Sequence, residues 1–447
     1  MRKTARSPFG LLASRAAAPA LLAAMALPLA AGAAEAPEPA AVTPEEPPLI
    51  SAPTREGVPA LQLSTDYGQP ALGFGTYAPI GQVDARGFRA GPATVRVATQ
   101  AAIGYNDNVV LSRTDKIGSM FYTVAPAVSA ALEGATQRFY AVYRGNYGAY
   151  ATGPQNDYAD HSVTLAALSS WTDRLRTMLS YDFYRGHTPR GLTVATLSES
   201  ERWAVHTVRG TVNYGAVGAQ GGLQGDVIHQ SRRYTTASGA SSVGEFDRFE
   251  LDGTFYYRLG SKTQALIRGR WADIDHPNDA TLDNREVHVD VGATWEALAA
   301  TTGRASVGYT DKKFDVALRP GFSGANFELG ASWRPRSYSL VDVSARRFLT
   351  ETYDIGGSFV INSYVNVLWN HVWNTGIAST LNYAYGRAEQ EGLNRTDTYQ
   401  TLAGRVSYPL RRWARVGAEL RHESRDSTAA TLEYTRNIML LTLETAL

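Results

Sequence analysis

The feature that most constrains the fold is a two-residue alternation of apolar and polar side chains, which begins near residue 93 and continues to residue 447. In one segment, for example, Val287, Val289 and Val291 alternate with His288 and Asp290. A period of two places alternate side chains on opposite faces of a sheet. No stretch of comparable length shows the 3.6-residue period of an amphipathic helix. The chain is therefore expected to be an all-β protein.

About 18 segments carry this alternation, which leaves about 20 residues for each strand and its share of the connections. That length suits a membrane-spanning strand of about 10 residues with one short turn and one longer loop. The predicted strands cover residues 93–105, 119–132, 137–151, 159–171, 175–186, 203–215, 220–233, 246–258, 262–273, 285–297, 303–314, 324–334, 337–348, 358–373, 377–388, 397–408, 412–424 and 429–445.

The connections between these segments alternate in length. Short links are expected near residues 134, 173, 219, 260, 300, 336, 375 and 409, and long polar links at 108–118, 153–157, 188–201, 234–244, 275–283, 314–322, 350–356 and 388–396. The last link, at 426–428, is expected to be brief. Outer-membrane barrels have short periplasmic turns and long external loops, so this sorting favours a transmembrane antiparallel up-and-down β-barrel of about 18 strands over a soluble sandwich.

Composition excludes several other classes. With 43 Lys and Arg against 42 Asp and Glu, the formal net charge of +1 does not indicate a nucleic-acid-binding protein. The absence of Cys excludes a disulfide scaffold, a thiolate zinc site and a cysteine nucleophile. No apolar run of about 18 residues follows the leader, which excludes a bundle of transmembrane helices. The 24 Tyr and 41 Gly favour a barrel.

The N-terminus has the order of a secretory signal peptide. Arg2, Lys3, Arg6 and Arg15 precede an apolar run, and small residues follow at positions 32–34. We therefore predict a signal peptide at residues 1–34, a signal anchor being the minor alternative, and localisation in the bacterial outer membrane. Its removal leaves 39 basic and 42 acidic residues, a net charge of −3.

Residues 35–92 form a separate N-terminal extension in this interpretation. Residues 35–60 are rich in Pro, Ala and Glu, which is typical of an extended linker. Residues 61–92 combine Gly and Pro with scattered apolar residues, and are expected either to enter the lumen or to cover a mouth. The barrel itself is predicted to span residues 93–447.

Aromatic residues recur just before the predicted short turns and share the parity of the apolar face. An amphipathic ring is stable at the level of the lipid head groups, so these residues are predicted to form the periplasmic aromatic girdle. They are Trp171, Tyr257, Trp295, Trp333, Trp373 and Tyr408.

Charged residues fall on the opposite parity and are expected to face the lumen, because a charge facing lipid costs about 2–4 kcal/mol at the bilayer midplane. A barrel of this size is too wide for its own side chains to fill, so a hydrated passage is expected. Whether the charges select solutes or only pair with one another stays open. The predicted lumen-lining residues are Arg144, Arg209, Arg268, Arg270, Arg304, Arg346, Arg405, Arg415, Arg421, Asp182, Glu328, Asp342 and Glu419.

Catalytic and cofactor signals are weak. The eight His show no metal-ligand spacing, and no Ser lies in a glycine-flanked nucleophile elbow. We therefore predict no enzymatic activity, no metal and no cofactor.

Three short motifs lead into the first long strand: Tyr-Ala-Pro-Ile-Gly at 77–81, Gly-Phe-Arg-Ala-Gly at 87–91 and Gly-Tyr-Asn-Asp-Asn-Val at 104–109. Together they resemble the outer-membrane β-barrel porin family often found with capsule or exopolysaccharide export genes. Asn106 stands where many members carry an acid. Leu447 ends the chain where most outer-membrane barrels carry Phe, as a variant of the signal read by the barrel-assembly machinery.

The resemblance implies a wide barrel that passes polysaccharide, received from a periplasmic polysaccharide-export protein. The first functional prediction is thus an exopolysaccharide or capsule secretion channel. The alternatives are a general diffusion porin for small hydrophilic solutes and a plugged structural or adhesion barrel. Outer-membrane lipid and lipopolysaccharide are the expected surroundings.

Overall fold

A computed structural model describes residues 87–192, 200–216, 218–236, 241–298, 300–317, 319–352, 354–374 and 376–447. The chain divides into two units, residues 1–51 and 52–447, and every described residue belongs to the second. The predicted signal peptide and most of the predicted 35–92 extension lie outside the described residues. No helix among the described residues is long and apolar enough to cross a membrane.

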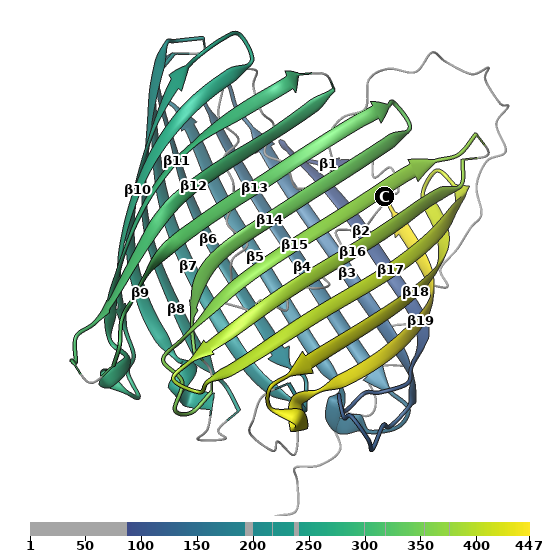
Figure 1. Cartoon of the computed structure of the whole chain (residues 1–447). Helices are drawn as coiled ribbons and strands as arrows, with labels where there is room; N and C mark the ends of the chain where they lie inside the picture. The colour runs from purple at the N-terminus through teal and green to yellow at the C-terminus, as the bar shows by residue number, and fades with distance from the viewer. Residues whose placement is uncertain are drawn as a thin grey trace, which may run out of the picture. The chain divides into compact units, whose positions relative to one another are not determined.

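The described part of the second unit is almost entirely β-structure, with four short 3-10 turns (Figure 1). The first strands are β1 (Phe88–Ala90), β2 (Ala93–Asn106), β3 (Ser119–Glu133), β4 (Gln137–Tyr150), β5 (Tyr158–Ser170), β6 (Leu175–Thr188), β7 (Glu201–Tyr214), β8 (Gly221–Tyr234), β9 (Phe246–Arg258) and β10 (Thr263–Asp275). The remaining strands are β11 (Asn284–Leu298), β12 (Thr301–Phe314), β13 (Phe322–Arg336), β14 (Ser339–Glu351), β15 (Phe359–Val372), β16 (Ala378–Glu391), β17 (Arg395–Arg411), β18 (Ala414–Ser427) and β19 (Tyr434–Ala446). The turns are η1 (Pro154–Asn156), η2 (Ser241–Gly244), η3 (Ala280–Leu282) and η4 (Ala430–Leu432).

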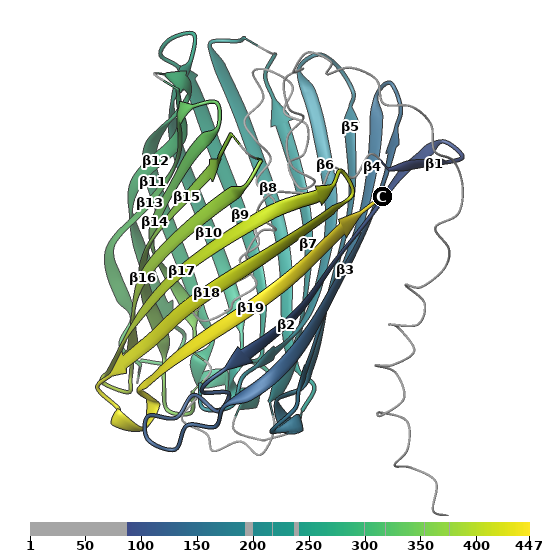
Figure 2. The same ribbon diagram turned by 90° about the vertical axis from the view of Figure 1, so that its right-hand side faces the viewer.

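Strands β2 to β19 pair antiparallel with their neighbours in chain order, and β19 then pairs with β2, where Leu443 stands opposite Ala101. The sheet is therefore closed, and Figure 2 shows this seam with β19 beside β2. The prediction of an antiparallel barrel of about 18 strands is confirmed. Closure satisfies the backbone N–H and C=O groups of every spanning strand, which a bilayer requires.

Two loop predictions were wrong. The link between β16 and β17 was expected to be long, but both strands extend beyond that range and meet in a turn of residues 392–394. Gly392 and Asn394 adopt positive φ values of 88° and 50° there, which a tight turn requires. The last link was expected to be brief, but it covers residues 428–433 and includes η4.

A further strand, β1, went unrecognised inside the predicted extension. It pairs with the start of β2, with Phe88 opposite Val95. Three residues are too few to show an alternation, so periodicity could not reveal it.

Large apolar side chains are exposed on one face of the wall, among them Ile267, Val289, Val307, Leu420 and Leu441. Exposure of so many such residues is unfavourable in water and favourable in hydrocarbon. The outer wall is thus suited to lipid.

The clusters of buried apolar residues in the described part of the chain lie at the end of the barrel that carries the longer connections, called here the long-loop end. Phe246, Ala272 and Ile274 form one cluster. The turns η3 and η4 have the same sequence, Ala-Thr-Leu, and each buries its leucine, Leu282 and Leu432. The loops therefore pack against the inner wall at this end.

Candidate functional site

Strand register sorts the side chains of the wall into two faces. Arg268 on β10 stands opposite Thr254 on β9 and Asp290 on β11, so these polar residues share a face. Their neighbours along each strand, such as Ile267 and Val291, are exposed on the other face. The polar face makes contacts between strands that are not neighbours, which in a closed barrel is feasible only on the inside.

Five predicted lumen arginines have acidic partners on this inner face. Arg268 Nε donates to Asp252 at 2.6 Å, Arg421 lies 2.8 Å from Glu419, Arg209 3.6 Å from Asp226 and Arg270 4.0 Å from Glu250, while Arg405 pairs with Glu444. Much of the predicted charge is therefore neutralised locally along the wall.

The other predicted lumen residues share the face but differ in their contacts. The hydroxyls of Thr164 and Ser332 donate to Asp182 and Asp342. Arg346 stands opposite Glu328 and lies over the ring of Phe348, and Arg144 stands opposite Ala127 and Ser162. Arg304 Nε and Arg415 Nε and Nη1 are buried without a hydrogen-bond partner among the described residues. The lining of a passage by all these residues stays a prediction.

All six predicted girdle aromatics lie near the end of the barrel with the shorter turns. Five are exposed and Trp295 is half-buried. The indoles of Trp171 and Trp373 donate to Thr177 and Ser379, near the start of the strand that follows each turn. The girdle role itself stays a prediction.

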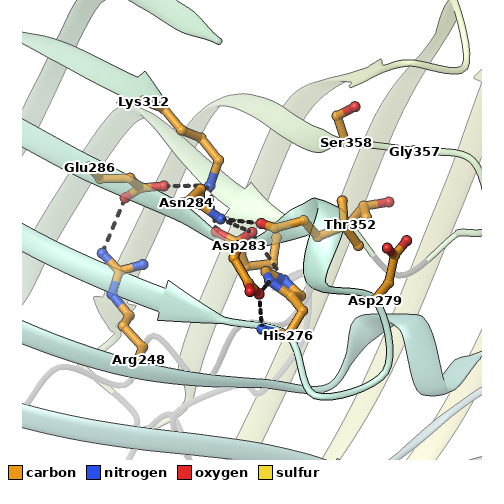
Figure 3. A network of polar contacts seen from close by, with 12 residues as sticks. Arg248, His276, Asp279, Asp283, Asn284, Glu286, Lys312, Thr352, Gly357 and Ser358 are labelled. Carbon is orange, nitrogen blue, oxygen red and sulfur yellow. Dashed lines mark hydrogen bonds and ion pairs between the residues drawn. The ribbon is translucent and has the colours of Figure 1, made fainter. Parts of the chain in front are cut away.

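At the long-loop end, Lys312 is the centre of a buried polar network (Figure 3). Its ammonium group is fully buried and donates to Asn284 Oδ1 at 2.8 Å, Glu286 Oε1 at 2.9 Å and Glu351 Oε1 at 2.7 Å. The network joins β11, β12 and β14, of which β14 is not a neighbour of β12.

The network extends on both sides of Lys312. Arg248 on β9 lies 3.2 Å from Glu286 and 2.9 Å from Glu250. His276, which follows β10, is fully buried with its Nε2 3.4 Å from Glu351. One ion-pair network thus ties together the inner wall from β9 to β14.

Arg319 joins three connecting segments at the same end. It donates to the Gly357 carbonyl at 2.9 Å and to Ser358 Oγ at 3.1 Å, and lies 3.4 Å from Asp279. The hydroxyl of Thr281 donates to Asp279 and holds the pKa of this loop carboxyl below its usual range. Asp279 therefore remains charged and available to Arg319 at neutral pH.

A second network lies farther round the wall. Arg395 bridges Asp354 at 2.7 Å and Asp397 at 3.1 Å, and Arg425 approaches the same Asp397 at 2.8 Å. Ser427 also donates to Asp397 at 2.6 Å. Charges of both signs alternate here, so each carboxylate has a cationic partner.

Arg425 also holds a loop from a distant part of the barrel. It donates to the Leu192 carbonyl at 2.7 Å, and Leu192 packs with Leu111 and Tyr434. Leu192 follows β6, whereas Tyr434 is on β19, reached from β6 by way of β5, β4, β3 and β2. Residues 189–192, the tether loop, therefore bridge wall segments that are far apart around the barrel.

Gly191 permits this approach. Its φ is +80°, and an added Cβ would lie 2.3 Å from the Val110 carbonyl oxygen. Any other residue there combines backbone strain with a collision with backbone.

Sequence reasoning missed Lys312, Arg425 and the tether loop. The alternation of side chains does place Lys312 and Arg425 on the inner face, and this is the indication of their position that the sequence offers. Nothing in the local sequence indicates that Leu192 contacts Tyr434, because the contact depends on closure of the barrel. Within the described ranges, no three His, Asp or Glu residues are grouped to hold a metal ion.

A family model described as "Putative beta-barrel porin 2" matches residues 81–447. The chain belongs to this porin family. Membership confirms the resemblance to a β-barrel porin family and identifies an outer-membrane barrel. The family and the fold are those of channels rather than enzymes. The family match does not show an association with capsule export.

Several solved structures are similar to this porin at low sequence identity. Pseudomonas aeruginosa OccK1 (OpdK) is 11% identical with a TM-score of 0.44, over 79% of this chain and 99% of that one. The BenF-like porin of Pseudomonas fluorescens Pf-5 is 10% identical with a TM-score of 0.44, over 79% and 99%. The FrpB iron transporter of Neisseria meningitidis is 12% identical with a TM-score of 0.43, and this chain covers 62% of its length. No curated protein sequence matches this porin.

Proposed function

We propose that this porin is a passive channel for small hydrophilic solutes, which is the general-porin alternative predicted from the sequence. The observation that carries the proposal is the combination of a charged inner wall with a tether loop that bridges distant wall segments at the long-loop end. Polysaccharide export has no support from the family description.

The charged wall favours hydrophilic cargo. Ion pairs such as Arg268–Asp252 and Arg209–Asp226 are spread along the inner face, where they hydrate readily and exclude apolar solutes. Because opposite charges lie side by side, an ion or sugar can exchange partners along the wall without a deep binding site.

The tether loop favours small cargo. It occupies part of the long-loop mouth and is held there by a buried hydrogen bond to Arg425 and by packing against Tyr434. A wide, unobstructed mouth is what an extended polymer needs, and this contact narrows it.

Planar-bilayer recording tests the proposal. The purified full-length chain should insert and give steady openings at constant voltage. Small sugars should diffuse into liposomes that contain it, whereas long oligosaccharides should be excluded. Absence of conductance from correctly folded protein would instead identify a plugged structural barrel, and flux of long oligosaccharides would contradict the size limit.

A further inference from the structure

The outward face of β5 to β8 carries a row of basic side chains at the long-loop end. We call Arg185, Arg202, His161, His206 and His229 the basic rim. Arg185, Arg202, His206 and His229 are exposed, and His161 is half-buried. By register, every described Asp and Glu of β5 to β8 is on the inward-facing set. The acidic residues nearest the rim have other basic partners, because Asp160 pairs with His187 at 2.9 Å and Asp247 of β9 pairs with Arg233 at 2.5 Å.

The rim differs from the same level elsewhere on the outer wall. Arg285 pairs with Asp273 at 3.1 Å, and Lys313 pairs with Asp311 at 3.0 Å. In contrast, the guanidinium groups of Arg185 and Arg202 are exposed and make no ion pair with any described residue. Within the described part of the chain, nothing therefore neutralises these two cations, and we expect them to be available to an external anion.

An apolar groove lies on the outer wall closer to the middle of the strands. Gly210, Gly225, Gly253 and Gly269 come from four neighbouring strands, β7 to β10, and a Cβ added at any of them would meet nothing within 4 Å. Apolar side chains such as Val227 border the groove, which has a volume of about 590 Å³. It is called the outer groove below.

The rim and the outer groove share strands β7 and β8. Gly210 follows His206 by four residues, and Gly225 precedes His229 by four, so each histidine is about 13 Å from its glycine along the strand. A ligand that fits both has an anionic head at the long-loop end and a hydrocarbon tail toward the middle of the bilayer.

We propose that the basic rim and the outer groove together bind a phosphorylated acyl glycolipid of the outer leaflet, with its phosphate on Arg185 and Arg202 and an acyl chain in the groove. Arg is the side chain best suited to a phosphate, because its planar guanidinium donates two parallel hydrogen bonds. The Tyr181 hydroxyl bonds His206 Nδ1 at 2.9 Å, which leaves Nε2 of that ring for the ligand. A membrane ligand also explains why the glycines border lipid without a packing partner.

Binding of the phosphate head group to the basic rim is tested with the full-length chain in a non-ionic detergent, with diphosphoryl lipid A as the probe. Replacing both rim arginines (Arg185→Gln with Arg202→Gln) should weaken binding at least about tenfold, since two charge-assisted contacts are lost. The matched control, Arg285→Gln with Lys313→Gln, should bind as the unmodified chain does. Equal binding by the rim variant, or full displacement of lipid A by millimolar inorganic phosphate, would overturn the proposal.

Binding of the acyl chain in the outer groove is tested with a pair of glycine substitutions. A Cβ added at Gly225 or at Gly404 meets nothing within 4 Å. Gly225→Leu places a side chain in the groove and should weaken lipid A binding, whereas Gly404→Leu, on the outer face of β17, should not. Native gel mobility before and after heating verifies that both variants fold. If Gly225→Leu bound lipid A as tightly as Gly404→Leu, the acyl chain would not lie in the groove and the proposal would fail.

Discussion

Lys312 illustrates how single residues stabilise the long-loop end. Its fully buried ammonium group satisfies Glu286 and Glu351, so removing it leaves two buried carboxylates without their main partner. We expect Lys312→Met to lower the free energy of unfolding by about 3–5 kcal/mol. Denaturant titration of the folded barrel in detergent, followed by tryptophan fluorescence, measures this loss.

The adjacent lysine provides the control. Lys313 points outward and is 78% exposed, and its one ion-pair partner among the described residues is Asp311. Exposed ion pairs contribute about 0–1 kcal/mol, so Lys313→Met should change little. Adding Glu286→Gln and Glu351→Gln to Lys312→Met should recover part of the loss. Equal effects of the two lysine substitutions would show that the network is not what stabilises this end.

At the scale of elements, we expect the tether loop to limit the size of the long-loop mouth. Gly191→Ala places a Cβ against the Val110 carbonyl oxygen and should displace residues 189–192 from Arg425 and Tyr434. We expect a larger single-channel conductance and a higher size limit for sugars in liposome swelling.

A substitution at Gly218 is the control that distinguishes the effect of displacing the loop from the effect of backbone strain. It also has a positive φ, +82°, but lies between β7 and β8 at the short-turn end, where an added Cβ meets nothing within 4 Å. Gly218→Ala should therefore leave the conductance unchanged. If both glycine variants conduct like the unmodified chain, the tether loop does not limit passage.

At the scale of the whole barrel, the wall reverses the usual rule that exposed positions tolerate charge. Leu441 is 62% exposed on the outer face at the seam of β19 with β2, and Leu440 is half-buried on the inner face. Leu441→Arg should cost about 2–4 kcal/mol in a bilayer, whereas Leu440→Arg faces the interior and should be milder. Folding into lipid vesicles, monitored by heat-modifiable gel mobility, distinguishes the two. A soluble protein would show the opposite order.

The sequence by itself determined the strands and their two faces, because side-chain alternation is a local property. It predicted Trp171, Tyr257 and Trp373 near the short-turn end, and Arg421 on the same face as Glu419. Tertiary structure decided what depends on closure: the β19–β2 seam, the contact of Leu192 with Tyr434, and the three acceptors of Lys312. These contacts join segments distant in the chain, and periodicity carries no information about which distant segments meet. The hairpin of β16 and β17 was missed for a related reason, since polar residues that pair inside a barrel have the composition of a loop.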